Sequence, residues 1–318
     1  MSTVQITVTG AAVLLPGIDS VTALAAGAPT GGEPVEPAVL IGRKGLRYKD
    51  RATQLGYCLA EAALRDAGLH GEAGVAVPDE SIGTVASSNY GNLDTVARAL
   101  DTLRAETVTG TSPMDLPNAS SNVIASSVAI RYGLRGPNLM VCNGATSGLD
   151  ALHWGATMIA AGRVERVLVL GVEPDNDVVR RLLGGERAVD GGAAVVLESA
   201  AAARERGATV RAVLGRYTRT GALGAVLDRL AGSAPEGPVR WQLPDAGGAT
   251  PASDLLPGVE RSALPPASGR ASGALGVLQC AAAVGFFDGG GRGAVYATAG
   301  GDTDDAGAGL VLLAPGTP

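Results

Sequence analysis

One stretch of the sequence, residues 135–152, has the pattern of a nucleophile site. A short apolar strand over residues 139–142 leads to the turn Gly144-Ala145-Thr146, and a helix that opens on small residues follows. This order of strand, turn and helix lifts a nucleophile out of an α/β sheet towards a substrate. The tip of the turn is Ala145, which carries no nucleophile, and Cys142 stands three residues earlier. The stretch is therefore either an active site that uses Cys142 or a site whose nucleophile has been lost.

Cys142 is a weak candidate for that nucleophile. It ends the apolar run Leu139-Met140-Val141, where burial would raise the pKa of the thiol and keep it protonated. The two histidines, His70 at a helix end and His153 on the helix after the turn, are not placed to serve as its base, and we expect both to be structural or solvent-facing. An acyltransferase or thioesterase that uses Cys142 remains the alternative.

Composition narrows the class of protein. The 318 residues are 46% hydrophobic and 18% charged, without an apolar run long enough to cross a bilayer. The N-terminus enters a β pattern directly, without a visible signal peptide, so we expect a soluble cytoplasmic protein. The net charge of −6, with no run among the 25 basic residues, argues against nucleic acid and offers no obvious cationic platform. Three scattered cysteines without a CxxC motif suggest neither a disulfide framework nor a metal site, and we expect no cofactor.

The elements that must hold the turn alternate between strand and helix, and this alternation predicts an α/β sheet covered on both faces. Residues 200–256 are weakly patterned, and the part that follows repeats the order of the first half. We therefore expect two intimately packed halves, 1–199 and 200–318. The predicted strands are 4–8, 81–88, 139–142, 164–172, 193–198, 293–298 and 309–313, and the predicted helices are 50–68, 92–104, 119–132, 152–161 and 272–287.

The helix over residues 92–104 carries an apolar stripe. Leu93, Val96, Leu100 and Leu103 fall at positions i, i+3, i+7 and i+10, so they share one helical face. The simplest interpretation of such a stripe is packing against the core of the same chain.

Five short blocks give a resemblance that covers nearly the whole chain. Singly each is weak, but their shared order and spacing resemble the thiolase-like β-ketoacyl synthases. The resemblance implies a pseudo-duplicated, five-layered α/β/α/β/α fold. The blocks are Val8-Thr9-Gly10, residues 60–69 (AEAALRDAGL), Pro117-Asn118, residues 134–138 (LRGPN) and residues 147–152 (SGLDAL).

The resemblance also locates the catalytic positions of that family, a cysteine at the turn and two histidines from the second half. The cysteine position falls on Ala145, the first histidine position on Ala246 and the second on Arg270, while Pro265 stands where the family has a lysine. Condensation needs an acylated thiolate and donors that orient decarboxylation and hold the developing oxyanion. None of the three residues present can fill these roles, so the resemblance implies a chain that does not condense acyl groups.

Within the family the chain resembles the chain length factors of type II polyketide synthases. These inactive subunits pair with an active ketosynthase as a heterodimer and shape the tunnel in which the polyketide grows. The run Gly148-Leu149-Asp150-Ala151-Leu152 is similar to theirs, but Ala145 stands where many of them have glutamine. The segment after Glu173 that covers the substrate is shortened to residues 174–191, which suits a subunit that binds no acyl thioester of its own. An acyl carrier protein would bring its phosphopantetheine-bound chain mainly through the ketosynthase.

This resemblance gives the apolar stripe a second interpretation, as a wall of the tunnel that limits product length. The stripe is aliphatic, which would suit a polyene or highly reduced chain. A homodimeric scaffold without catalysis is the remaining alternative. The candidates for tunnel or interface are Leu93, Val96, Leu100, Asp115, Pro117 and Asn118.

Overall fold

The computed structural model describes residues 4–28, 31–72, 74–113, 115–234, 236–245, 255–301 and 304–316, with only the backbone of residues 115 and 116. Ten of the described strands form one mixed sheet, and two short strands, β2 (His70–Gly71) and β3 (Gly74–Val75), form a separate hairpin. The ten strands are β1 (Ile6–Leu14), β4 (Ile82–Ser87), β5 (Asn138–Val141), β6 (Arg166–Glu173), β7 (Gly191–Ser199), β8 (Ala212–Thr220), β9 (Pro238–Gln242), β10 (Glu260–Ser262), β11 (Ala294–Ala299) and β12 (Gly307–Leu313).

The strand order repeats between the two halves of the chain. The first five strands of the large sheet are ordered β5-β4-β6-β7-β1, and the last five β10-β9-β11-β12-β8. Counted along the chain, both orders are third, second, fourth, fifth and first. In each half the fifth strand, β7 or β12, runs antiparallel to both of its neighbours. The predicted pseudo-duplicated fold is confirmed, and the repeat supports our proposal that the halves are 1–199 and 200–318.

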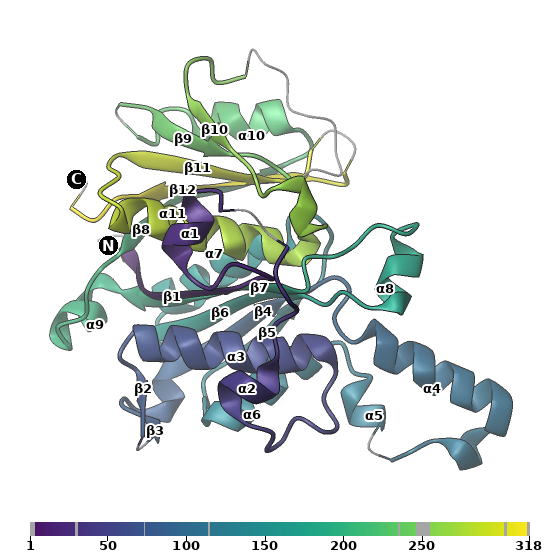
Figure 1. Ribbon diagram of the computed structural model, residues 1–318. Coiled ribbons are helices and arrows are strands. Elements are labelled where there is room, and N and C mark those ends of the chain that lie inside the picture. Colours follow the sequence, from purple (N-terminus) through teal and green to yellow (C-terminus); the bar gives the residue numbers. More distant parts are fainter. Residues whose placement is uncertain are drawn as a thin grey trace.

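The two halves stack as five layers, which Figure 1 shows from top to bottom: helix, sheet, helices, sheet, helices. A short pairing of β1 with β8 joins the two sheets at one edge. The outer layers are α10 above and α2, α3 and α6 below, while α1, α7 and α11 lie between the sheets. These helices span Val21–Ala25 (α1), Pro37–Ile41 (α2), Arg51–Asp66 (α3), Val123–Tyr132 (α6), Ser147–Ala160 (α7), Leu223–Leu230 (α10) and Leu275–Asp288 (α11).

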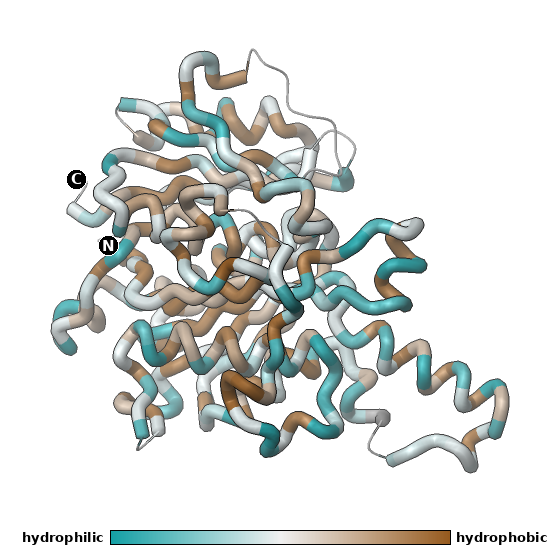
Figure 2. Tube along the Cα trace, in the orientation of Figure 1, coloured by the Kyte–Doolittle hydropathy of each residue, from teal (hydrophilic) through white to brown (hydrophobic). Residues whose placement is uncertain are grey.

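The distribution of apolar residues in the strands and helices explains the layers. The strand β6 is buried along its whole length, as expected for a strand covered on both faces. The helix α11 is apolar all round and nearly every residue is buried, because it lies between two sheets. Figure 2 shows hydrophobic residues concentrated in the sheets and the central helices.

The central helices α7 and α11 cross at two glycines. A Cβ atom on Gly276 would lie 2.2 Å from the backbone nitrogen of Leu149, and one on Gly148 would lie 2.6 Å from the nitrogen of Gly276. A side chain at either position would push the helices apart, so the small residues at the start of α7 set the distance between the two halves.

Two sequence expectations about elements are wrong. The first strand does not end at Thr9-Gly10 but continues to Leu14 through an irregularity between Val8 and Gly10. Gly10 is needed there because a Cβ atom would lie 2.6 Å from the carbonyl oxygen of Ala63 on α3. The weakly patterned region 200–256 contains α9 (Ala200–Glu205), β8, α10 and β9. The strand β8 escaped prediction because a third of it is exposed, at Gly215, Arg216 and Arg219.

One part of the molecule projects from these layers. The helix α4 (Leu93–Glu106) extends away from the body beside α5 (Asp115–Asn118) and the short helix η2 (Val108–Gly110), as Figure 1 shows at the lower right. Of its residues only Thr95 is buried. Its contacts are with α5, η2 and α8 (Asp177–Leu182) rather than with the central sheet.

Candidate functional site

The turn at Ala145 keeps the geometry of a nucleophile elbow. Strand β5 ends at Val141, Gly144 adopts a φ of +87° that a side chain would strain, and α7 begins at Ser147. Ala145 lies half-buried between them, at the point where a nucleophile would stand. The turn therefore has the required backbone shape and lacks the reactive atom.

Asn89, which follows β4, fixes this turn by hydrogen bonds to its backbone. Its Nδ2 donates to the carbonyl of Gly144 at 2.9 Å, and the backbone N–H of Gly144 donates to its Oδ1 at 3.2 Å. The same Nδ2 donates to the hydroxyl of Ser272, just before α11, at 2.8 Å. Sequence reasoning missed Asn89, since no motif distinguishes it.

Glu173 at the end of β6 is a fully buried carboxylate beside the turn. Its oxygens accept hydrogen bonds from the backbone N–H groups of Asn89, Tyr90 and Gly273 at 2.7, 3.0 and 2.9 Å, and from the hydroxyl of Ser88 at 2.8 Å. Burial raises the pKa of Glu173 to about 7, against the opposing effect of these four donors. Because Gly273 belongs to the second half, this carboxylate ties the two halves together behind the turn.

Asp150 in the first turn of α7 forms a second buried polar cluster. It accepts hydrogen bonds from Asn143 Nδ2 at 2.6 Å, from Thr146 Oγ1 at 2.8 Å and from the hydroxyl of Tyr217. Burial and the charge of Asp150 raise the pKa of Tyr217 above its ordinary range. The ring of His153 stacks on Tyr217 at 4.1 Å, and burial lowers the pKa of this histidine. His153 thus packs on a neighbouring ring.

Arg270, which the sequence resemblance assigns to the second histidine position, lies near two acidic side chains. Its guanidinium lies 3.6 Å from Glu186 and 3.9 Å from Asp245. Asp245 also accepts the backbone N–H groups of Ala271 and Ser272 at 2.8 and 2.9 Å. Arg270 therefore carries a paired positive charge where a neutral imidazole would be needed. Ala246, the first histidine position, lies outside the described residues.

The expectation that Cys142 is buried in a strand is wrong. Strand β5 stops at Val141, and Cys142 is exposed in the loop that follows. Partial desolvation nevertheless raises the pKa of its thiol, and the nearby charge of Glu173 raises it further. The thiol is accessible but disfavoured as a thiolate, which is the opposite of an activated nucleophile.

The apolar stripe on α4 does not pack into the core of its own chain. Leu93 and Val96 are half-buried, Leu100 is 48% exposed and Leu103 is 40% exposed. The interpretation as core packing is therefore wrong for Leu100 and Leu103. The stripe has the predicted periodicity, but the described part of the chain supplies no surface that covers Leu100 and Leu103.

The other candidates lie at the base of α4. Asn92 Nδ2 donates to the carbonyl of Asn118 at 2.6 Å, which joins the start of α4 to α5. The side chain of Asn118 is buried and accepts a hydrogen bond from Lys49 Nζ at 3.1 Å, whereas Pro117 is exposed. Asp115 lies in the first turn of α5, where only the backbone is described.

The short segment after Glu173 forms a compact loop around α8. Asp175 accepts hydrogen bonds from Arg180 and Arg187, which lower its pKa despite burial. Asp190, with a strained φ of +46°, pairs with Arg51 through both carboxylate oxygens at 3.0 and 2.8 Å. These pairs fix the loop against α3.

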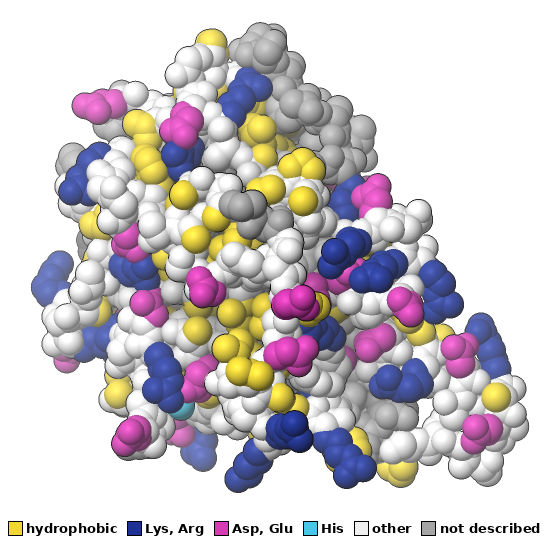
Figure 3. All heavy atoms as spheres, in the orientation of Figure 1, with side chains coloured by type: hydrophobic (Ala, Val, Ile, Leu, Met, Phe, Trp, Pro, Cys, Tyr) yellow, Lys and Arg dark blue, Asp and Glu magenta, His cyan; other side chains and the backbone are white. Residues whose placement is uncertain are grey.

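One loop of the chain carries several basic residues, although the net charge of the whole chain is negative. Arg43, Lys44, Arg47 and Lys49 lie in one loop before α3, close to Arg131 on α6. Figure 3 shows Lys and Arg side chains along the lower edge of the molecule. The absence of a cationic platform, expected from the net charge, is therefore corrected.

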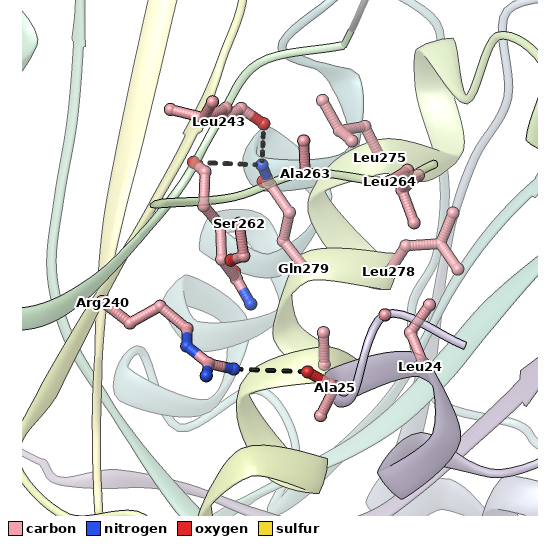
Figure 4. Close-up of a pocket in the computed structure, with 13 residues that line it drawn as sticks. Leu24, Ala25, Arg240, Leu243, Ser262, Ala263, Leu264, Leu275, Leu278 and Gln279 are labelled. Carbon is pink, nitrogen blue, oxygen red and sulfur yellow. Dashed lines mark hydrogen bonds between the residues drawn. The ribbon is translucent and has the colours of Figure 1, made fainter. Parts of the chain in front are cut away.

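A small pocket lies on the face of α11 next to α1, β9 and β10. Figure 4 shows Arg240 and Gln279 on one side and Leu24, Leu264 and Leu278 on the other. Arg240 Nε and Gln279 Oε1 are buried without a hydrogen-bond partner. The pocket offers about 50 Å³, which is room for a few water molecules and not for an acyl chain.

The residues that the structure describes contain neither a membrane-spanning helix nor a metal-binding cluster. No helix there is long and apolar enough to cross a membrane. In the same residues, no group of three or more His, Cys, Asp or Glu side chains could hold a metal ion.

Much of the first half of the chain matches a known protein family. Residues 36–180 match the profile "Beta-ketoacyl synthase, N-terminal domain". The chain is 30% identical over 134 residues to 3-oxoacyl-[acyl-carrier-protein] synthase 2 of Vibrio harveyi, covering 41% of this chain and 31% of that protein. It is 27% identical over 208 residues to the putative polyketide beta-ketoacyl synthase 2 of Streptomyces cyaneus, covering 58% and 50%. The matched part of the chain thus spans between about a third and a half of the length of these relatives.

Solved structures share the fold along nearly the whole chain. The ishigamide ketosynthase/chain length factor aligns with a TM-score of 0.79 and 18% identity, covering 99% of this chain and 100% of that one. The AntDE:AntF complex, a type II acyl-carrier protein with its ketosynthase bound to the hexaketide, aligns with a TM-score of 0.79 and 16% identity, covering 98% and 100%. A beta-ketoacyl synthase from Burkholderia phymatum STM815 gives 0.77 and 17%, covering 98% and 99%.

Proposed function

We infer that this chain, a member of the β-ketoacyl synthase family, is a non-condensing subunit of the chain length factor kind. It pairs with an active ketosynthase in a type II polyketide synthase and forms part of the tunnel that sets product length. Such an assembly would work in the cytoplasm.

The observation that carries this proposal is Ala145 on a fully maintained turn. The elbow keeps a glycine in the left-handed conformation at Gly144 and several hydrogen bonds to its backbone, yet the atom that would attack the acyl group is missing. Arg270, whose guanidinium lies 3.6 Å from Glu186 and 3.9 Å from Asp245, would remove a second role of the family triad. The turn therefore serves the fold and the interface rather than chemistry.

Two exposed features support a partner subunit. The leucines at positions 100 and 103 of α4 face solvent in the single chain, which is costly for a helix whose stripe is apolar. Strand β5 is an edge of the large sheet, and its residues Leu139 and Met140 are only half-buried. An open edge with apolar side chains is a surface that proteins normally cover.

The wall of the tunnel would come from α4 and α5. Leu93, Val96 and Leu100, with Asp115, Pro117 and Asn118 at the base, line one projecting unit. Close-packed walls do not absorb added methylenes cheaply, so their size would limit the chain. The aliphatic stripe suits a reduced or polyene product. The carrier protein would present its chain mainly through the ketosynthase, in keeping with the carrier–ketosynthase complex among the structural neighbours.

Co-expression with an active ketosynthase tests this function. A chloroacetyl-pantetheine probe should label the ketosynthase and leave Cys142 of this chain unmodified. Leu93→Trp or Val96→Trp should shorten the product while acylation of the ketosynthase stays intact, and Val239→Trp on the distant strand β9 should change neither. Unchanged products with both tryptophan variants would refute this placement of the wall.

The alternatives give distinct results in the same experiment. Rapid and selective labelling of Cys142 would favour an acyltransferase or thioesterase. A stable symmetric dimer of this chain that ignores the ketosynthase would favour a homodimeric scaffold.

A further inference from the structure

A groove of about 590 Å³ lies between the loop before α3, helix α3 and helix α6, and the residues that line it do not include the turn at Ala145. Its walls are rich in positive charge although the chain as a whole carries a net charge of −6. Its volume falls within the range of small-molecule sites. The groove is lined by Lys44, Lys49, Tyr57, Ser127, Arg131 and Tyr132, together with Glu61, His70 and Ile130.

Lys49 is a half-buried cation held only by neutral groups. Its Nζ donates to Asn118 Oδ1 and to Ser127 Oγ, each at 3.1 Å, and it pairs with no carboxylate among the described residues. An ammonium has three donors, so one is left for a ligand. A partly desolvated charge without a counter-charge is unfavourable, and a bound anion would offset that cost.

Arg131 presents a second cation to the same groove. Its guanidinium lies over the ring of Tyr57 at 4.8 Å and near that of Tyr132 at 5.9 Å, and it donates to the carbonyls of Lys44 and Ile41 at 3.1 and 3.5 Å. Within the described chain it too pairs with no carboxylate. These contacts use two of its five donors and hold the guanidinium rigid.

The acidic residue of the groove is already neutralised. Glu61 pairs with Arg65 one turn further along α3, and its Oε1 lies 3.4 Å from His70 Nδ1. The hydroxyl of Tyr57 stays protonated, because burial raises its pKa. The groove therefore combines two unmatched cations with hydroxyl donors and little opposing charge.

We propose that this groove binds a phosphate group, as inorganic phosphate or as a phosphate monoester. A dianion matches both unpaired cations, whereas a single carboxylate would leave one unmatched. The tetrahedral oxygens can accept from Lys49, Arg131 and the hydroxyl of Tyr57 together, whereas the hydroxyl of Tyr132 already donates to the carbonyl of Tyr57. The volume exceeds that of phosphate alone, and the exposed side chain of Ile130 would border the organic part of an ester. An acidic protein surface would contact the exposed Lys44 but would not reach the half-buried Lys49, so it fits the groove less well than a small anion does.

Calorimetric titration of the full chain with inorganic phosphate, at constant ionic strength in a phosphate-free buffer, tests this site. We expect one saturable site, with affinity lowered about tenfold in Lys49→Met and in Arg131→Gln. Arg229→Gln, an exposed cation on α10 at the opposite face, is the matched control and should bind as the wild type does. Phenyl phosphate distinguishes the two sources, since tighter binding than inorganic phosphate indicates an ester site and equal binding a free-phosphate site.

Thermal unfolding separates binding from folding. Lys49→Met removes an unmatched charge together with two hydrogen bonds, so the melting temperature without phosphate should change little, and a given phosphate concentration should raise it less than in the wild type. If either variant fails to fold, Ser127→Ala provides a milder test, with a smaller loss of affinity. Absence of saturable phosphate binding, an equal loss in Arg229→Gln, or binding of an acidic carrier protein without phosphate binding would overturn the proposal.

Discussion

The turn around Ala145 and the helix α4 differ in how much contact they make with the rest of the chain. The turn has no nucleophile, yet Asn89, Glu173 and Asp150 hold its backbone and flanking elements through buried hydrogen bonds. The helix α4 carries an apolar stripe and buries a single residue. The chain therefore maintains a turn that carries no nucleophile, and its described residues leave exposed part of an apolar helix face.

The groups around the turn stabilise the single chain, whereas the apolar face of α4 would contribute to the binding of a partner. The groups behind the turn join the halves, because Glu173 binds both Asn89 in the first half and Gly273 in the second. Losing the nucleophile removes none of these bonds, so the turn can persist without activity. The stripe on α4 contributes little to the single chain, and its sequence pattern makes sense only against another surface.

The comparison predicts its largest effect at Glu173. Glu173→Ala should lower the free energy of unfolding by about 3–5 kcal/mol, because it leaves several buried donors without an acceptor and opens a cavity. Glu205→Ala, at an exposed position on α9, should change it by less than about 0.5 kcal/mol. Chemical denaturation of both variants measures the difference, and equal stabilities would mean that the carboxylate does not hold the halves together.

Stability should also depend on pH through the same group. Burial raises the pKa of Glu173 from an ordinary value of 4.5 to about 7. Between these values the unfolded chain has lost this proton while the folded chain keeps it, so the free energy of unfolding falls as the pH rises, by about 3 kcal/mol in total. Denaturation curves between pH 5 and pH 8 measure this slope. Glu173→Gln cannot titrate, and a slope that survives this substitution would assign it to other groups.

The smallest effect on the single chain is expected at α4. Replacing both Leu100 and Leu103 by serine should change the stability of the isolated chain by less than about 1 kcal/mol, since both are exposed. The same change should weaken the heterodimer about tenfold, because a partner would bury these side chains. Val39→Ser, at a position 81% exposed on α2, is the control. Analytical ultracentrifugation with the ketosynthase measures the affinity, and an unchanged dissociation constant would place the interface elsewhere.

Much of the first half could be predicted from the sequence. The periodicity of residues 50–68 and the β-branched run of residues 164–172 correspond to α3 and β6, because local pattern and burial agree there. The second half was harder to predict. Strand β8 joins two sheets and a third of it is exposed, so its pattern shows neither alternation nor a continuous apolar run.

For the site, the sequence by itself determined which atoms are present. It places Ala145 at the turn and Arg270 before the last central helix, and no folding can give these two side chains a thiol or an imidazole. Only the tertiary structure decided which side chains meet. Asn89, Glu173 and Gly273 are up to 184 residues apart in the chain, and the exposure of Cys142 and of the α4 leucines depends on where the layers end. Periodicity shows that a face is apolar, but only packing decides whether that face is covered by its own chain or left for another.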